Sequence, residues 1–419
     1  MPVASRSLSR LSATVALCAI ALAACVPKPT IPAAPAAPVA EGPETAPGNP
    51  ITENKPTFLT LPNMSTEHTP VRIGIVLPFS SGTPAVKALA QAMLKSAEMA
   101  VYESGNRDIV LMMADEGATP SDAANAADRL LRQGAEVIVG PLYGPSAKAI
   151  APQARDRGVP VIGFSTDKNV AGDGVYLIGF LPDGDAARIA TYALGQGKHK
   201  FAALVPATAF GDVTLHAFRA TVTGGKDKDD KSGPGEMGQI EHFEGTIDGV
   251  AGPAAKLARA DADAVFIPQG GPVLRAATPA LAAGGFDPSK LKILGTGQYN
   301  DPANIAEPTL SGAWFAGPDP KGETAFNAKF RDQFGATPPP LAVLAYDAVS
   351  LIAELAKGEP YKRFTRTALM DPNGFAGAEG IFRFGPDGTA ERGLAIISIA
   401  PDGFHVVDPA PTTFVKPGS

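Results

Sequence analysis

Short, almost continuously apolar runs alternate with amphipathic stretches where the regular part of the chain begins. The runs at 71–77, 109–113 and 137–139 have the composition expected of strands buried on both faces of a parallel sheet. Between them, residues 86–103 carry apolar side chains at helical spacing, and start and stop residues predict a second helix over 119–134. This alternation predicts a doubly wound α/β sheet.

Residues 135–166 are the best candidate for a binding crevice in this pattern. Two apolar runs, at 137–139 and 159–162, are each followed by small and polar residues, at 140–146 and 163–166. Ligands usually bind at the carboxyl ends of the strands in open α/β sheets. We therefore expect these two strand ends to line a binding site.

The alternation continues to residue 356 and then changes character. Further strands are predicted at 175–180, 201–205, 239–243, 264–268 and 291–295. Further helices are predicted at 183–194, 212–222, 250–260, 272–283, 323–334 and 341–356. Pro-Asp-Gly turns then separate three short apolar runs, which predicts antiparallel strands at 381–384, 394–399 and 404–407. Because 419 residues are too many for one core, the pattern predicts two doubly wound parallel-sheet lobes.

The N-terminus has the features of a bacterial lipoprotein signal. A segment with two arginines leads into the apolar run 13–22, and the sequence Leu-Ala-Ala-Cys that follows resembles a lipobox ending at Cys25. The apolar run is too short to span a bilayer, so residues 1–24 are predicted to be cleaved and Cys25 to be lipidated. The alternative is an ordinary signal peptide with a chance cysteine. Val26 stands where Asp would favour inner-membrane retention, so the prediction is anchoring to the outer membrane.

Residues 25–70 are predicted to be a tether. The 45 residues from position 26 to position 70 contain 11 prolines, and such a segment buries too little apolar surface to fold. In an extended polyproline form it would reach roughly 140 Å. It is either a passive spacer or a device that lets the folded body work far from its anchor.

Charge and cysteine content exclude several classes of function. The 36 basic and 42 acidic side chains give a net charge of −6, without a basic stripe, which argues against nucleic-acid binding. The two cysteines lie at 18 and 25, so the mature body has no disulfide or cysteine metal site. An acidic loop over 224–238 lacks the spacing of an EF-hand and is predicted to be solvated, not a calcium site. No nucleophile, metal or cofactor motif is found, so neither catalytic residues nor a cofactor is predicted.

Several segments resemble the type I periplasmic-binding-protein fold, and within it the Leu/Ile/Val-binding family. They are VRIGIVLPFSSG from position 71, AEVIVGPLYGPSAKAIAPQARDRGVPVIGFST from position 135, AFGDVTLHAFRAT from position 209 and DADAVFIPQGGPVLRAATPALAAGGF from position 261. The resemblance implies crossing strands near Leu181, Gly312 and Lys357 and a hinge that closes two lobes over a ligand. It places 71–182 with 313–357 in lobe 1, 183–312 with 358–409 in lobe 2, and leaves 410–419 as a tail.

The resemblance also suggests ligand-binding positions. In the family's amino-acid receptors, hydroxyl and backbone N–H groups after the third and fourth strands hold the ligand carboxylate. Here these positions fall on Tyr143, Ser146, Phe164, Ser165 and Thr166. Ser146 heads a helix, where it would either favour an anion or cap the helix. The receptors' serine-rich run is replaced by Leu-Tyr-Gly-Pro, which removes donors.

Four more positions are candidates for the crevice. The acidic residue that pairs with the ligand's ammonium group falls near Gln298, and glutamine cannot supply that charge. Phe210, Gln269, Gln298 and Tyr299 would line the crevice or would serve as ordinary lobe packing.

A second resemblance is to the C-terminal domain of outer-membrane lipoproteins that activate penicillin-binding proteins. It rests on the Gly-Pro-Leu after the third strand, the phrase FLPDGDAARIATYA from position 180 and the lipobox with its long tether. The activators' N-terminal helical-repeat domain is missing here. The favoured interpretation is a non-enzymatic envelope lipoprotein that engages a penicillin-binding protein in peptidoglycan synthesis. The alternative is the substrate-binding protein of an ABC importer, partnered by a permease, for branched-chain amino acids or a similar small polar solute.

Overall fold

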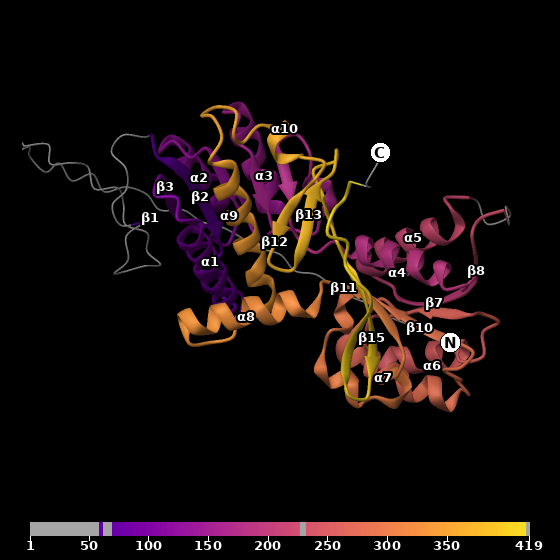
Figure 1. Cartoon of the computed structure of the whole chain (residues 1–419). Helices are drawn as coiled ribbons and strands as arrows, with labels where there is room; N and C mark the ends of the chain where they lie inside the picture. Colours follow the sequence, from indigo (N-terminus) through magenta and orange to yellow (C-terminus); the bar gives the residue numbers. More distant parts are fainter. Residues whose placement is uncertain (1–57, 62–68, 227–231, 416–419) are drawn as a thin grey trace, which may run out of the picture. The chain divides into compact units, whose positions relative to one another are not determined.

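The computed structural model describes residues 58–61, 69–226 and 232–415 (Figure 1). The predicted signal segment 1–24, Cys25 and most of the predicted tether lie outside these residues. The described residues form two α/β lobes built on separate, mostly parallel sheets, with a small third sheet. The predicted fold class is therefore confirmed.

Lobe 1 contains a six-stranded sheet with the order β1-β3-β2-β4-β5-β6. Its strands are β1 (Phe58–Thr60), β2 (Val71–Leu77), β3 (Ile109–Asp115), β4 (Val137–Val139), β5 (Val161–Gly163) and β6 (Val175–Leu177). All neighbouring strands run parallel except β1, which is antiparallel to β3. Helices cover both faces, as continuously apolar strands require.

Two separate apolar clusters hold the helices of lobe 1 against its sheet. One face packs against α1 (Pro84–Ser104), α8 (Pro320–Phe334) and α9 (Val343–Leu355). The other face packs against α2 (Pro120–Arg132) and α3 (Gly144–Asp156). Figure 1 shows α9, from late in the chain, beside the early sheet and α1.

Lobe 2 contains a seven-stranded sheet with the order β16-β15-β11-β10-β9-β7-β8. Its strands are β7 (Lys200–Pro206), β8 (Glu236–Phe243), β9 (Ala264–Phe266), β10 (Lys292–Gly295), β11 (Trp314–Gly317), β15 (Ala395–Ala400) and β16 (Gly403–Asp408). One face packs against α6 (Ile247–Leu257) and α7 (Gly271–Ala283), and the other against α4 (Pro182–Gly195) and α5 (Ala209–Thr223).

The third sheet belongs with lobe 1. Its strands are β12 (Phe375–Gly377), β13 (Gly380–Phe384) and β14 (Ala390–Arg392), preceded by the short helix α10 (Arg366–Leu369). Phe382, Phe384 and Ala390 pack into the same apolar cluster as α1 and α9. The three C-terminal runs predicted as antiparallel strands are therefore divided between the lobes.

Two boundaries differ from the sequence prediction. Strand β11 pairs with β10 and β15 in the second sheet, whereas residues 313–357 were expected in lobe 1. Residues 366–392 pack with lobe 1, whereas 358–409 were expected in lobe 2. Strand pairing over long sequence separations decides both boundaries, and it leaves no local signal.

The predicted tether also ends earlier than expected. Residues 58–60 form β1 at the edge of the first sheet, and Leu61 is buried in its apolar cluster. Leu59 also packs against this cluster, so Leu59 and Leu61 supply apolar surface that the proline-rich part lacks.

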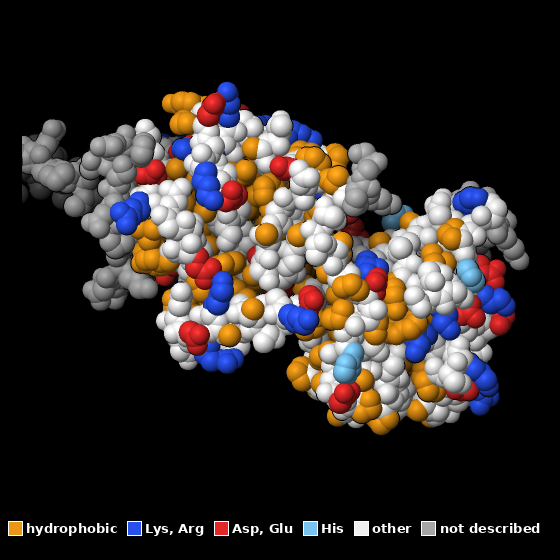
Figure 2. Space-filling view, viewed as in Figure 1, with side chains coloured by type: hydrophobic (Ala, Val, Ile, Leu, Met, Phe, Trp, Pro, Cys, Tyr) orange, Lys and Arg blue, Asp and Glu red, His pale blue; other side chains and the backbone are white. Residues whose placement is uncertain are grey.

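Figure 2 shows basic and acidic side chains interspersed over the face in view. None of the helices in the described residues is long and apolar enough to cross a membrane.

Candidate functional site

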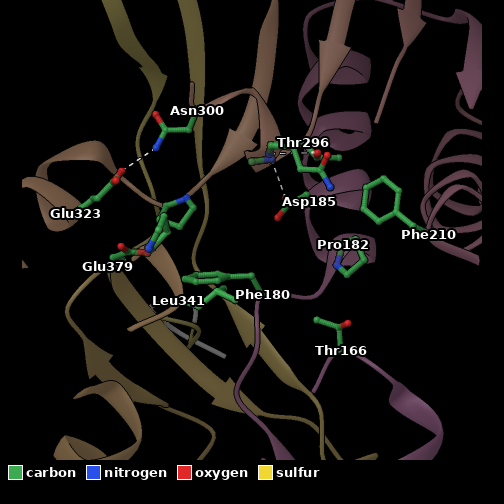
Figure 3. A pocket seen from close by; sticks show the side chains of 14 residues that line it. Thr166, Phe180, Pro182, Asp185, Phe210, Thr296, Asn300, Glu323, Leu341 and Glu379 are labelled. Atoms are coloured by element: carbon green, nitrogen blue, oxygen red, sulfur yellow. Dashed lines mark hydrogen bonds between the residues drawn. The ribbon is translucent and has the colours of Figure 1, made fainter. Parts of the chain in front are cut away.

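A cavity of about 520 Å³ is lined by residues from both lobes (Figure 3). Its volume lies in the range of small-molecule sites, roughly 300–1,000 Å³. Much of its wall is apolar, from Phe180, Phe210, Leu341 and the prolines at 182, 318 and 340. Such a wall is suited to the hydrocarbon part of an organic solute.

The charged part of the cavity wall is entirely acidic. Three carboxyl groups line the cavity, those of Asp185, Glu323 and Glu379, and the described residues that line it include no Lys, Arg or His. Figure 3 shows Glu323 and Glu379 on one side of the cavity and Asp185 and Phe210 on another. The uncharged polar lining comes from Thr166, Thr296, Gly297, Gln298 and Asn300.

Asp185 lies in the first turn of α4, next to the loop that follows β10. Its Oδ2 accepts a hydrogen bond from the backbone N–H of Gly297 at 2.9 Å. Burial raises the pKa of Asp185 to about 7; the Gly297 hydrogen bond opposes this rise and the negative charge of Asp183 adds to it. Asp185 therefore exchanges its proton near neutral pH.

Glu379 lies in the tight turn between β12 and β13, and its side chain lines the cavity. The residue is 9% exposed, and its carboxyl group forms no hydrogen bond or ion pair within the described part of the chain. Desolvation raises its pKa to about 8; neighbouring Asp347 and Glu323 add to the rise and Arg392 opposes it. A buried carboxyl without a partner is unusual and marks a binding-site candidate.

Arg392, the cation whose charge acts on Glu379, is paired with other groups through both Nη atoms, and its buried Nε forms no hydrogen bond within the described residues. Its Nη1 donates to Asp347 Oδ2 at 3.2 Å, and its Nη2 donates to the carbonyl of Ile178 at 2.9 Å. Its guanidinium lies 4.5 Å from the ring centre of Phe180, and Phe180 lines the cavity where Arg392 does not. Asp347 also accepts a hydrogen bond from the N–H of Ala378, 2.7 Å away. This buried pair supports the turn that carries Glu379.

Glu323 is held differently from the other two acids. Its Oε2 accepts a hydrogen bond of 2.7 Å from Nδ2 of Asn300, so a residue of α8 contacts the segment after β10 (Figure 3). Asn300 also lines the cavity. Glu323 is therefore partly satisfied by the protein, whereas Glu379 is not.

Three of the nine predicted ligand-binding residues line this cavity: Thr166, Phe210 and Gln298. The side-chain oxygen of Gln298 accepts a hydrogen bond from the N–H of Gly270 at 3.0 Å. That bond orients the amide and leaves its NH₂ group as a donor.

Tyr143 and Ser146 do not line the cavity. Both instead contact a buried acid of the protein, Glu116. The carboxylate of Glu116 accepts hydrogen bonds from the N–H groups of Leu142, at 2.8 Å, and Tyr143, at 3.1 Å. Ser146 is buried and also hydrogen-bonds to Glu116 through its side chain. The suggested capping role of Ser146 is wrong, because Tyr143 is the N-cap of α3 and no side chain caps it.

The remaining four candidates are also outside the cavity wall. Phe164 and Ser165 are buried, and the Ser165 hydroxyl accepts a hydrogen bond from the N–H of Asp167. Gln269 is half-buried. Tyr299 is fully buried and donates its hydroxyl to the carbonyl of Ile267 at 2.8 Å.

Glycine makes room for the Tyr299 ring. A Cβ at Gly295 would lie 2.4 Å from that ring, so packing explains the glycine at the end of β10. The phenol acts as a core side chain with its one polar group satisfied.

Sequence reasoning missed Glu116 and the three acids of the cavity. Asp185 had a weak signal, because it follows a predicted strand at the start of a predicted helix. Glu379 and Glu323 had none, since only the tertiary fold places them at the same cavity. The described residues contain no cluster that could hold a metal ion.

Comparison with known proteins places the fold in a family. A sequence model described as "Periplasmic binding protein" matches residues 70–403. The chain belongs to the periplasmic binding protein family. The two-lobe architecture is that of its type I members, whose solved structures include Leu/Ile/Val-binding proteins. No curated protein matches the chain.

Solved structures of this family share the fold at low sequence identity. A substrate-binding protein of an ABC transporter from Sphaerobacter thermophilus is 20% identical, with a TM-score of 0.61, over 82% of this chain and 98% of its own. A branched-chain amino acid substrate-binding protein from Streptococcus pneumoniae, in complex with isoleucine, is 21% identical (TM-score 0.55, 81% and 100% covered). A solute-binding protein from Rhodopseudomonas palustris, in complex with 3,4-dihydroxybenzoic acid, is 20% identical (TM-score 0.57, 83% and 98% covered).

Proposed function

We propose that this protein is the non-enzymatic solute-binding component of an ABC importer and that it binds a small organic solute. The observation that carries the proposal is the cavity of about 520 Å³, which combines an apolar wall with a few polar groups from both lobes. Preformed cavities of this composition are typical of small-molecule sites. The family and the similar structures support the importer alternative better than the interpretation favoured from sequence.

The solute differs in one respect from those seen in the similar structures. Isoleucine and 3,4-dihydroxybenzoic acid both carry a carboxylate. In this chain two backbone N–H groups after β4 already donate hydrogen bonds to the Glu116 carboxylate. The described lining of the cavity also has no basic residue. Both observations favour a neutral or cationic solute over an anionic one.

A ligand screen tests this function. The folded body, without residues 1–57, is purified from its own host, and any small molecule that co-purifies is identified by mass spectrometry. In parallel, the melting temperature is measured with a library of neutral, cationic, zwitterionic and anionic solutes. A ligand at 100 times its Kd should stabilise the fold by about 2.7 kcal/mol. If no solute shifts the melting temperature, the proposal is wrong.

Regulation of peptidoglycan synthesis is the second candidate function. The phrase FLPDGDAARIATYA, which resembles the activators of penicillin-binding proteins, spans the start of α4 and includes the cavity residues Phe180, Pro182 and Asp185. We propose lipidation at Cys25 and anchoring to the outer membrane for either function. Binding of the mature protein to the host's penicillin-binding proteins, measured by surface plasmon resonance, would support this candidate, and no binding to any of them would exclude it.

A further inference from the structure

We propose that Glu379 and Asp185 bind a positively charged group of the solute, and that binding releases a proton from the cavity. The inference rests on the proposed solute-binding function and specifies its ligand class, organic cations such as primary amines. It is argued from the position, the partners and the surroundings of the two carboxyl groups.

The first argument is the unsatisfied state of Glu379. It is 9% exposed, lines the cavity and has no partner among the described residues. A buried ionised carboxylate is strongly disfavoured unless a cation or several hydrogen-bond donors accompany it. The described residues supply neither to Glu379, so before a cation binds the protonated acid is favoured. A cation in the cavity would supply the missing partner.

The second argument is the charge that surrounds the cavity. Three charged side chains act on Glu379: Asp347 from α9, Glu323 from α8 and Arg392 from β14. Arg392 is paired with Asp347 and lies over the ring of Phe180, away from the cavity wall. The field at Glu379 is therefore dominated by acids, and it would repel an anion.

The third argument is the second carboxyl group. Asp185 accepts one hydrogen bond, from Gly297, and faces the same cavity from α4. Its charged neighbour on α4 is Asp183, which forms an ion pair with Lys168. Asp185 thus offers a carboxylate from lobe 2 while Glu379 offers one from lobe 1.

The apolar wall limits the cation to an organic one. Phe180, Phe210 and Leu341 would cover the hydrocarbon part of such a solute, and aromatic faces also attract cations. A bare metal ion is disfavoured, because it would require several oxygen ligands around one point.

Proton release follows from the change in protonation. Near neutral pH the carboxyl of Glu379 is mostly protonated before binding, because its pKa is raised to about 8. A cation beside it favours the ionised form, so the proton leaves to solvent when the cation binds. From Glu379 alone, affinity for a cation should then rise about tenfold between pH 6 and pH 7 and level off above pH 8, and Asp185 should add to the rise.

The test uses two sets of compounds that share a skeleton and differ in charge: benzylamine, benzyl alcohol and benzoate, and isoamylamine, isoamyl alcohol and isovalerate. Melting temperature and calorimetric affinity are measured for the folded body at pH 6, 7 and 8.5. Calorimetry in buffers of different ionisation enthalpy counts the protons released. We expect at least one amine to bind, with release of about one proton at pH 7, and neither carboxylate to bind.

Variants identify the groups responsible. Glu379→Gln keeps the shape of the protonated acid, so it should fold. It should lower amine affinity at least tenfold and reduce proton release to the smaller part that comes from Asp185. The matched control Glu244→Gln changes an exposed acid outside the cavity and should behave like the wild type. If Glu379→Gln fails to fold, Asp185→Asn is measured instead, with weaker amine binding expected.

Three results would overturn the inference. They are binding of a carboxylate in preference to its amine, amine affinity that does not change with pH, and unchanged amine binding by Glu379→Gln. If neither amine binds but another solute in the wider screen does, the cation inference is wrong and the solute-binding function stands. If nothing in the screen binds, both are wrong.

Discussion

Two buried acids, one beside the segment that follows strand β4 and one in the wall of the cavity, have opposite surroundings. At the end of β4, Glu116 receives hydrogen bonds from Leu142, Tyr143 and Ser146. In the cavity, Glu379 receives none from the described residues. Burial raises the pKa of both acids, but at Glu116 the hydrogen bonds oppose the rise, and the main opposition at Glu379 is the charge of Arg392.

This difference separates a structural acid from a binding acid. Glu116 completes the fold of lobe 1, because it satisfies N–H groups that would otherwise be orphaned at the start of α3. Glu379 costs stability when it ionises and stabilises nothing through a partner in the chain. A group of that kind is retained most readily where a ligand completes it. Asp347 belongs with Glu116, since it is fully buried and paired with Arg392.

The largest effect should come from breaking the buried pair. Asp347→Ala leaves Arg392 buried without its carboxylate and should reduce the free energy of unfolding by about 3–5 kcal/mol. Urea denaturation followed by circular dichroism measures this. The double variant Asp347→Leu with Arg392→Met removes both charges and should cost less than the sum of the single changes. An Asp347→Ala variant as stable as the wild type would contradict a structural role.

The next effect concerns Glu116. Glu116→Ala leaves the N–H groups of Leu142 and Tyr143 without their acceptor and should cost about 2–4 kcal/mol in the same assay. Glu244→Ala, at an exposed acid, should change stability by less than about 0.5 kcal/mol. If Glu116→Ala costs no more than this control, the contrast between structural and binding acids fails.

Titration of Glu379 should make the free energy of unfolding depend on pH. Its pKa is raised from 4.5 to about 8, so the folded state holds a proton that the unfolded state loses above about pH 4.5. This proton-linked stability is fully present below pH 4.5 and is lost as the pH rises through 8. Between pH 5 and 7, ionisation of Glu379 should lower the free energy of unfolding by about 1.4 kcal/mol per pH unit. The Glu379→Gln variant should lack this contribution to the slope. Equal slopes in variant and wild type would show that Glu379 titrates normally.

Asp185 should give a smaller total effect over a lower pH window. Its pKa is raised from 3.8 to about 7, so its proton-linked stability is present below pH 3.8 and is lost as the pH rises through 7. Asp185→Asn should flatten the stability profile from pH 4 to 7 and leave the profile above pH 8 unchanged. Chemical denaturation at six pH values measures both windows, and a change confined to the region above pH 8 would contradict the assignment.

The regular elements were predictable from sequence because their signals are local. The strand over 71–77 and the helix start at Thr119 depend on apolar spacing and capping within a few residues. The structure contains a capping box there, with Asp122 and Thr119 hydrogen-bonded to each other's backbone. Thr166 was found among the cavity residues because it follows a predicted strand end, whereas Phe210 and Gln298 were suggested by the resemblance to the Leu/Ile/Val-binding family.

The acids of the cavity could not be predicted in the same way. Asp347 lies in a helix where spacing alone does not reveal that it is fully buried, and Glu379 lies in a two-strand turn that resembles any exposed hairpin. Their burial depends on α9, the third sheet and Phe180 packing together over large sequence separations. Tyr299 was predicted to line the crevice, but it is buried in the core. Its ring fits there because Gly295 has no side chain, a contact that sequence spacing does not reveal.

The sequence by itself determined the strand and helix alternation and the two-lobe class. Each of these depends on composition or on residues close together in the chain. The tertiary structure alone decided which strands end each lobe, which N–H groups Glu116 satisfies and which carboxyl is left without a partner. Desolvation and charge pairing depend on distances across the fold, and a linear pattern does not contain them.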